Sequence, residues 1–446
     1  MNPRTRLDRF ADFIVQFVPD AITASVILLL LLAVFALALG NTPLQLIDAY
    51  YKGFWSLLPF TSQMTLTIVL GAALASSPVF QTAVGALSRL PRTASQMVAL
   101  AVLLTALASY CFWGLGYALC PLVAVFFARE AERKGIPLHF PFFLATVYAA
   151  VAVWQFGLSA SAPLLVATPG HFLENLTGVI PLSRTIGSPA AIIDIVVYLA
   201  AVIATGSLLM PASNRPLSDF PSAWLLAEQA PAEPFKPTTY SEKLEAAPFV
   251  SWILCAALLA WLWYHFIQKA AGLNINSMNV TLLLLTFLVL GNVKRVSQAL
   301  EKAVVSAWPI IILYHLYAGL SGLIEHTSVG ETMASLVAAS SNPLTFPVLS
   351  AAIATVFAFF IPSSGGQWAI QGLVTVKSAM ALGVSVERAL LALSVGDHMG
   401  NLTSPFWYVI VAGIARVDFR TFFGYGLIYA AIWFLIGAVV FTFAPC

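Results

Sequence analysis

The sequence carries little charge. Only 9% of its 446 residues are Asp, Glu, Lys or Arg, whereas 60% are hydrophobic, and the mean hydropathy is +0.90. A soluble domain needs far more charge on its surface, so we exclude that class and expect an all-α polytopic membrane protein embedded in a lipid bilayer. The net charge of +2 is small and scattered, and we expect no nucleic acid partner.

Cysteines and catalytic motifs are also scarce. The four cysteines, Cys111, Cys120, Cys255 and Cys446, show no paired spacing, which supports neither a disulfide framework nor a zinc site. The chain lacks a His-Glu-x-x-His motif and any evident nucleophile with a base and an orienting group. We therefore expect no catalytic residues, no metal and no cofactor, and an intramembrane enzyme is a remote alternative.

Long apolar runs dominate the chain instead. A membrane span needs about 20 mostly apolar residues, and on that criterion we count thirteen candidate segments. They lie at about 21–39, 55–76, 96–112, 114–130, 140–167, 190–210, 250–268, 277–291, 303–324, 343–361, 364–382, 388–412 and 421–444. The first run is long enough to span, so we expect an uncleaved helix there, although Ala36-Leu37-Ala38 resembles a cleavage site.

The basic residues predict an orientation. With the amino terminus in the cytoplasm, sixteen of the 21 Lys and Arg residues lie on the cytoplasmic side, as the positive-inside rule requires. The count is the same whether 96–130 and 343–382 are re-entrant hairpins or crossing pairs, because either arrangement returns the chain to the side it left. The sequence leaves both options open.

The order of segments predicts two inverted repeats. We expect a first transmembrane repeat at 1–211, a cytoplasmic proline-rich linker at 212–248, a connecting helix at 249–269 and a second repeat at 270–446. The lone helix makes the offset between the two six-segment halves odd, so equivalent helices run in opposite directions. The alternative is a loose match of the kind that any helical membrane protein offers.

Polar, glycine-punctuated strings interrupt matching segments of the two halves. The first half contains Trp113 to Gly116 and then Gly157 to Pro163, and the second contains Pro362 to Gln367 and then Gly396 to Pro405. Backbone freed by glycine and proline cannot face lipid, because each unpaired N–H or C=O there costs several kcal/mol. Such broken helices are typical of the enclosed sites of secondary transporters.

The first string of each half predicts an anion site. Where two apolar segments meet at a tip, free N–H groups and the positive end of a helix dipole attract an anion. The substrate-binding candidates in these strings are Trp113, Gly114, Gly116, Ser363, Ser364, Gly365, Gly366 and Gln367. The alternative for the glycines is a tight helix contact.

The second string of each half supplies neutral donors just before a proline that opens the helix ladder. Hydroxyls and amides can bind a carboxylate without the desolvation cost of a buried Lys or Arg, and neither string contains a basic residue. The further substrate-binding candidates are Ser159, Ser161, Asn401, Thr403 and Ser404. The alternative is that the hydroxyls bond back within their own helices.

Asp397 and His398 are adjacent ionisable residues deep in a predicted span. A charge at mid-membrane is costly, so such residues usually face a cavity and mark an ion or proton pathway. We predict that Asp397 binds the coupling cation with His398 as helper, and the alternative is a hydrogen-bonded structural pair. Asp194 lies near the start of its span, and we expect it to reach the interface.

At these strings the sequence resembles the short-chain fatty acid transporter family, whose founding member imports acetoacetate and related acids in bacteria. The resemblance covers nearly the whole chain and rests on the order and number of short motifs. These are Phe17-Val18-Pro19-Asp20, Gly53-Phe54-Trp55, Phe127-Ala128-Arg129-Glu130, Pro163 to Gly170, Pro362 to Gly372 and Pro405-Phe406-Trp407.

The resemblance implies the ion-transporter superfamily fold, in which inverted repeats with hairpins move in an elevator-like way, often as a homodimer. It implies a symporter of short-chain fatty acids or related monocarboxylates in the bacterial cytoplasmic (inner) membrane, coupled to H⁺ or Na⁺. The chain departs from the founding member at Phe112, Ser364, Gln367 and the Asp397-His398 pair, which leaves the particular acid open. A dicarboxylate transporter is the alternative, although two negative charges would normally demand an Arg in the strings.

Overall fold

The computed structural model describes residues 21–445 except 76, 212–214, 221–236 and 362. The amino-terminal arginines, Pro362 and much of the predicted linker at 212–248 therefore lie outside the described residues. The described part of the chain is helical throughout and contains no strand, which confirms the all-α prediction.

The helices of the first half precede a short linker region. They are α2 (Ala21–Ala38), α3 (Pro43–Phe54), α4 (Leu58–Ala75), α5 (Pro78–Leu87), α6 (Ala94–Cys111), α7 (Trp113–Arg133), α8 (Phe140–Ala149), the 3₁₀ helix η1 (Ala150–Phe156), α9 (Ser161–Val166), α10 (Glu174–Thr177), η2 (Leu182–Arg184) and α11 (Pro189–Leu208). The linker region contains η3 (Leu217–Asp219) and α12 (Tyr240–Ala246), followed by α13 (Pro248–Trp263) and the π-helical η5 (Tyr264–Gln268).

The helices of the second half follow. They are α14 (Ile275–Leu290), α15 (Val293–Ala303), η6 (Val304–Ala307), α16 (Trp308–Glu325), α17 (Val329–Ala339), α18 (Phe346–Phe360), α19 (Ser364–Ala381), α20 (Val386–Thr403), α21 (Pro405–Ala415) and α22 (Arg420–Phe443). In both halves the first apolar helix is followed by a glycine with positive φ, Gly40 at +87° and Gly291 at +83°. Glycine adopts that left-handed conformation at little cost, so it can end the first apolar helix of each half.

Every predicted segment coincides with one or more helices, but several of these helices are short or broken. Within the described ranges, six are long and apolar enough to cross a membrane: Ala94–Cys111, Trp113–Arg133, Phe140–Val166, Pro189–Leu208, Pro248–Gln268 and Arg420–Phe443. The pair Pro43–Phe54 and Leu58–Leu74, bent by 44°, makes a seventh if it is one span. The chain thus has the several apolar helices of a multi-pass membrane protein.

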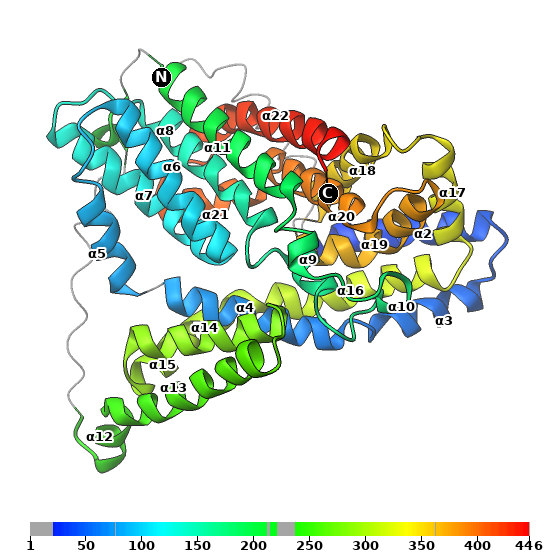
Figure 1. Ribbon diagram of the computed structural model, residues 1–446, viewed down its shortest axis with the longest axis horizontal. Helices are drawn as coiled ribbons and strands as arrows, with labels where there is room; N and C mark the ends of the chain where they lie inside the picture. The colour runs from blue at the N-terminus through cyan, green and yellow to red at the C-terminus, as the bar shows by residue number, and fades with distance from the viewer. Residues whose placement is uncertain (1–20, 76, 212–214, 221–236, 362, 446) are drawn as a thin grey trace.

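The helices form two bodies, each built from both halves (Figure 1). What we call the arm contains α2, α3 and α4 packed against α14, α15 and α16, with α13 beside α14. What we call the bundle contains α6 to α9 and α11 packed against α18 to α22. The bodies meet where α4 contacts α7 and where α16 contacts α19. Within each body, helices from the two halves lie side by side, such as α3 with α16 and α8 with α22.

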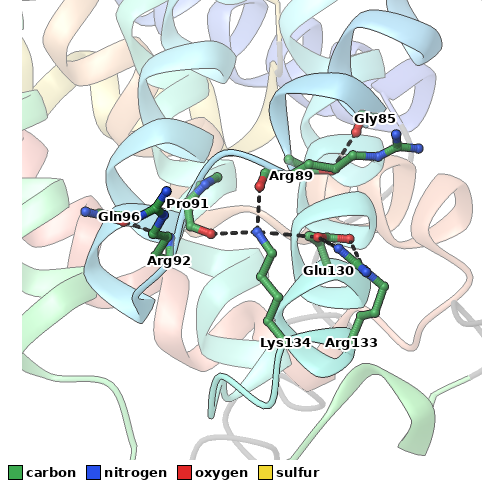
Figure 2. Close-up of polar contacts among 9 residues, drawn as sticks. Gly85, Arg89, Pro91, Arg92, Gln96, Glu130, Arg133 and Lys134 are labelled. Atoms are coloured by element: carbon green, nitrogen blue, oxygen red, sulfur yellow. Dashed lines mark hydrogen bonds and ion pairs between the residues drawn. The ribbon is translucent and has the colours of Figure 1, made fainter.

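Two helix pairs of the bundle fold back on themselves, and we call α6–α7 hairpin 1 and α18–α19 hairpin 2. The base of hairpin 1 is held by Lys134 at the end of α7, whose Nζ donates to the carbonyl oxygens of Arg89 at 2.5 Å and Pro91 at 2.8 Å, just before α6 (Figure 2). Glu130 accepts two bonds from Arg133, at 2.6 and 2.9 Å, and pairs with Lys134 at 3.4 Å. The tip of hairpin 1, at Phe112, lies at the opposite end of the two helices.

The position of Asp194 corrects one expectation. Its side chain is fully buried on α11, and neither carboxylate oxygen has a hydrogen-bond partner among the residues that the structure describes. Asp194 shares the buried face of α11 with Tyr198 and Val202, at helical spacing, while the opposite face is exposed. The prediction that it reaches the interface was wrong, because the side chain points into the bundle.

Candidate functional site

The tip of hairpin 1 meets the break between η1 and α9. Phe112 is extended, with φ −155° and ψ 120°, so α6 ends and α7 begins at one residue. The backbone N–H of Trp113 donates to Ser159 Oγ at 2.9 Å, and the N–H of Leu158 donates to Tyr110 O at 2.7 Å. The first of these bonds joins the two polar strings of the first half directly, and the second joins Leu158 to the end of α6.

The tip of hairpin 2 and the break of α20 and α21 reach the same region through Gln155 of η1. Ser364 Oγ, in the first turn of α19, donates to Gln155 Oε1 at 3.5 Å, and Gln155 Nε2 donates to Asp397 Oδ2 in α20. Hydrogen bonds thus join the tip of hairpin 1 to the first break, and join the tip of hairpin 2 and α20 to η1 just before that break. Polar groups of both halves meet there although the halves are far apart in sequence.

Asp397 lies at the centre of this cluster and is fully buried. Besides Gln155, its Oδ2 is 3.5 Å from the Nδ2 donor of Asn401, one helical turn away, and Asn401 Oδ1 accepts from Trp407 Nε1 at 3.2 Å. Across the described ranges, Oδ1 of Asp397 has no hydrogen-bond partner and no ion pair includes the residue. A buried carboxylate whose neighbours are neutral lacks the positive charge that would stabilise its ionised form.

His398 points into an aromatic environment instead of toward Asp397. The imidazole is fully buried, 5.3 Å from the Trp433 ring and 6.2 Å from the Trp154 ring. Neither ring nitrogen has a hydrogen-bond partner in the described part of the chain. The pair is therefore not joined by a hydrogen bond there, which argues against the alternative of a hydrogen-bonded structural pair.

Aromatic side chains wall the cluster on the side of hairpin 1. Trp407 stacks on Tyr117 at 4.2 Å, and Trp113 lies 6.2 Å from both Trp407 and Trp154. Indole rings of this kind offer apolar faces beside N–H donors, an arrangement suited to a short acyl chain with a polar head. Trp368, the other tryptophan beside a string, is fully buried within α19.

Both hairpin tips touch the arm. At hairpin 1 the Phe112 ring lies so close to Gly71 of α4 that a Cβ on that glycine would be 1.8 Å from Phe112 Cε1. At hairpin 2, Ser363 Oγ donates to Tyr314 Oη of α16 at 3.1 Å, and a Cβ on Gly365 would be 2.7 Å from that same oxygen. The two tips therefore lie at the boundary between arm and bundle.

Some predicted residues are close to the cluster but use their side chains elsewhere. Gln367 donates to Ala354 O at 2.8 Å and to Gln371 Oε1 at 2.6 Å, within hairpin 2, and Thr403 bonds back to Met399 O at 2.9 Å. Ser404 caps α21 by accepting from Phe406 N at 3.4 Å. Of these three, Thr403 bonds back within its own helix, as the alternative for the hydroxyls describes.

The remaining predicted residues are backbone or first-turn positions. Gly116 contacts Ser109 of α6, which fits a tight contact within hairpin 1, whereas Gly366 packs against the Tyr317 ring of the arm. Gly114 packs under the Phe112 ring, and Ser161 is the buried first residue of α9. Gly114 and Gly366 thus keep the tips small, and Ser161 lies at the first break.

Sequence reasoning missed Gln155. The residue lies two positions before the Gly157 string, within a run of apolar residues, and is fully buried. It belongs to a 3₁₀ helix of seven residues, longer than the usual three or four, and such stretches within a helix often mark a functional hinge. An isolated glutamine in an apolar span directly before a break was the available signal.

The described residues contain no group of three or more His, Cys, Asp or Glu side chains that could hold a metal ion. A cavity of about 190 Å³ lies away from the breaks, between hairpin 2 and the helices α16 and α17. Its walls are mainly apolar and include Ile324, Met333, Leu336, Phe346 and Val374. The cluster around Asp397 is therefore the site that we consider further.

Two solved structures share the fold. The Alcanivorax borkumensis YdaH transporter, described as having an unusual topology, matches with a TM-score of 0.60 and 18% identity over 95% of this chain and 96% of its own. Neisseria gonorrhoeae MtrF, described as illuminating a class of antimetabolite efflux pumps, matches with a TM-score of 0.55 and 14% identity over 98% and 97%. At these identities the likeness concerns the fold alone.

Sequence comparison is more specific. A provisionally named short-chain fatty acid transporter of Escherichia coli (strain K12) is 30% identical over 98% of this chain and 99% of its own length. A protein of Haemophilus influenzae (strain ATCC 51907 / DSM 11121 / KW20 / Rd) with the same provisional name is 28% identical over 97% and 99%. The model of the family described as "Short chain fatty acid transporter" matches residues 5–443. The chain is thus a transporter and not an enzyme, and it belongs to the short chain fatty acid transporter family.

Proposed function

We propose that the protein is a secondary active symporter that moves short-chain fatty acids or related monocarboxylates across the bacterial cytoplasmic membrane. The observation that carries this proposal is Asp397, a fully buried carboxylate of α20 that bonds to Gln155 just before the first break and, through Gln155, is linked to the tip of hairpin 2, with no ion pair within the described residues. Burying an ionised carboxylate is expensive. A proton or Na⁺ that binds with the substrate removes this cost.

Substrate binding is proposed between the two tips. The first N–H groups of α7 and α19 have no partner within their own helices. The positive ends of these helices would face the carboxylate of the bound substrate. Ser159, Ser161 and Ser364 add hydroxyls, Asn401 adds an amide, and the tryptophans wall the acyl chain. Gly114, Gly116, Ser363, Gly365, Gly366, Gln367, Thr403 and Ser404 shape the tips and breaks that present these groups.

We further propose that the two halves are inverted repeats and that the bundle moves against the arm as an elevator. The matching order of elements and the interleaving of both halves in each body support the repeat. The hairpin 1 tip contacts Leu158 and Ser159 inside the Phe140–Val166 span, as a re-entrant hairpin would. The cytoplasmic amino terminus follows from the positive-inside count, and the homodimer follows from the family resemblance.

The test is uptake of radiolabelled butyrate by the purified protein in liposomes, with an inward H⁺ or Na⁺ gradient. We expect wild-type protein to accumulate butyrate with one of the gradients and Asp397→Asn to lose at least tenfold in accumulation, because an amide takes up no proton and has no negative charge to hold Na⁺. Asp194→Asn is the matched control, since Asp194 is an equally buried carboxylate on α11, which contributes no break. We expect this control to stay within about twofold of wild type.

Two outcomes would contradict the proposal. If Asp397→Asn still accumulates butyrate against its gradient, Asp397 is not the coupling site. If the liposomes accumulate a dicarboxylate such as succinate but no monocarboxylate, the alternative substrate class holds.

A further inference from the structure

Gln155 connects the proposed cation site to the tip of the opposite hairpin. Its Nε2 donates to Asp397 Oδ2 in α20, and its Oε1 accepts from Ser364 Oγ in α19 at 3.5 Å. All three side chains are nearly or fully buried, at 0%, 0% and 4% exposure. A side chain from the first half therefore lies between two groups of the second half, in a place where water cannot easily substitute for it.

The chemistry of an amide gives this contact two orientations. An ionised carboxylate only accepts hydrogen bonds, so it requires the NH₂ side of Gln155. A carboxyl that has bound a proton presents an O–H donor, and a bound Na⁺ prefers an oxygen ligand, so both favour the carbonyl side of the amide. Rotation of the amide by half a turn exchanges the two sides within nearly the same volume, since the oxygen and nitrogen are similar in size.

The other end of the amide reverses at the same time. With the carbonyl toward Asp397, the NH₂ group faces Ser364, whose hydroxyl then accepts where it had donated. Ser364 follows Ser363, which caps α19 and donates to Tyr314 of the arm, and it precedes Gly365, which packs against Tyr314 and Phe60. The change therefore reaches the part of hairpin 2 that is docked on the arm.

We propose that Gln155 is a positioning residue whose amide orientation reports the cation occupancy of Asp397 to the tip of hairpin 2. This proposal rests on the coupling role of Asp397 proposed above. It gives the transporter a two-state element that the coupling ion can bias, as an ion-driven switch requires. In this proposal the orientation of the Gln155 amide decides whether hairpin 2 stays docked on the arm or is released from it.

The test separates coupling from substrate binding in liposomes. Gln155→Met keeps the length and volume of the side chain but removes both hydrogen-bonding groups. We expect counterflow of radiolabelled butyrate against preloaded unlabelled butyrate, with no ion gradient, to stay within about threefold of wild type. We expect gradient-driven accumulation of butyrate to fall at least tenfold.

A matched control is Gln371→Met. Gln371 is also a buried glutamine of the bundle, but its amide accepts from Gln367 within α19, and among the described residues it has no hydrogen bond to Asp397. We expect both assays to stay within about twofold for this variant. Gln155→Asn, one methylene shorter, can keep one of the two hydrogen bonds and should show intermediate accumulation, at least threefold below wild type with counterflow intact.

The outcomes are distinguishable from failure of the proposed function. If Asp397→Asn loses accumulation while Gln155→Met and Gln155→Asn keep it, the coupling site stands and the role of Gln155 is wrong. Equal losses of counterflow and accumulation in the Gln155 variants would also overturn it, because they indicate a structural or substrate-binding role. If Gln155→Met does not fold, as a melting curve would reveal, Gln155→Asn decides by the same criteria.

Discussion

In the first half the chain break follows η1 and is lined by Gln155, Ser159 and Ser161, none of which ionises. In the second half the break follows α20 and carries the ionisable Asp397 and His398. The first break is held by hydrogen bonds to the tip of hairpin 1, whereas the second is closed by its own cap at α21. The two breaks thus differ in chemistry. The first presents neutral groups held by hydrogen bonds, whereas the second presents a carboxylate that can bind a proton or another cation.

The largest effect that can test this comparison is steric. A Cβ on Gly157 would lie 2.5 Å from Tyr110 O and 2.9 Å from Tyr110 Cα, backbone atoms that cannot move aside, whereas a Cβ on Gly365 would meet the ends of two side chains, Tyr314 and Phe60. We expect Gly157→Ala to lower the free energy of unfolding by about 1 to 3 kcal/mol, and Gly365→Ala to have less than half that effect. Melting temperatures of the purified variants measure the difference.

Gly413→Ala serves as the control for both variants, because nothing lies within 4 Å of a Cβ added there. An equal drop in melting temperature for Gly365→Ala and Gly157→Ala would show that the tip of hairpin 2 is held as rigidly as the first break, and this contrast would fail.

An intermediate effect is expected from the two serines at the breaks. Ser159 accepts a hydrogen bond from Trp113 N of hairpin 1, whereas Ser404 accepts from Phe406 N of its own helix. Each substitution to Ala should cost about 1 kcal/mol of stability, the usual contribution of such a bond or cap. We expect Ser159→Ala to raise the KM for butyrate more than Ser404→Ala does, since only Ser159 ties a hairpin tip to a break.

Uptake kinetics at several butyrate concentrations, together with melting curves, measure both effects. If Ser404→Ala raises the KM at least as much as Ser159→Ala, the second break takes part in positioning hairpin 1 and the division between the breaks is too simple.

The smallest expected effect is on the pH dependence of stability. It concerns the connections that follow the breaks, a long connection at 167–188 in the first half and a short turn at 416–419 in the second. His171 in the long loop is buried, with Nε2 3.0 Å from Gly178 O and with Nδ1 accepting from Leu173 N at 3.3 Å. Burial lowers the pKa of His171 from the ordinary value of 6.5, and the nearby Glu174 opposes this in part. The unfolded chain therefore takes up the proton first on acidification.

It follows that the contribution of His171 to stability is fully present above a pH of about 6.5 and is lost as the pH falls through the lowered pKa. We expect the melting temperature of wild-type protein to fall more between pH 7.5 and 5.5 than that of His171→Gln, which has no proton to gain. Identical pH dependence of the two proteins would remove His171 as a pH-sensitive element of the first-half loop.

Much of the fold could be predicted because hydrophobicity and glycine act locally. The apolar runs correspond to helices, and the glycine and proline strings correspond to breaks, since lipid tolerates no unpaired backbone. The same reasoning failed for Asp194, because position along a span does not reveal which face of the helix a side chain occupies. It also missed Gln155, whose importance depends on two contacts from residues more than 200 positions away.

The contacts of some candidate residues could be predicted from the sequence, and those of others could not. Asp397 and Asn401 could be paired from their spacing of one helical turn, and the structure joins them. Gln367 and Thr403 carry the same donors as their neighbours, yet their side chains bond within hairpin 2 and within α20. Rotamers and neighbouring helices decide that choice, and neither can be read from residue type.

The amino-acid sequence alone determined that this chain is a helical membrane protein, where its helices break and that its ionisable pair lies in the second half. These properties depend on the free energy of transferring side chains and backbone from water to lipid, and that free energy is set by the residues of each segment alone. Only the tertiary structure decided that Gln155 of the first half lies between Asp397 and the tip of hairpin 2 and so links the halves. Contacts of that kind depend on how distant helices pack, and their geometry is not contained in any single segment.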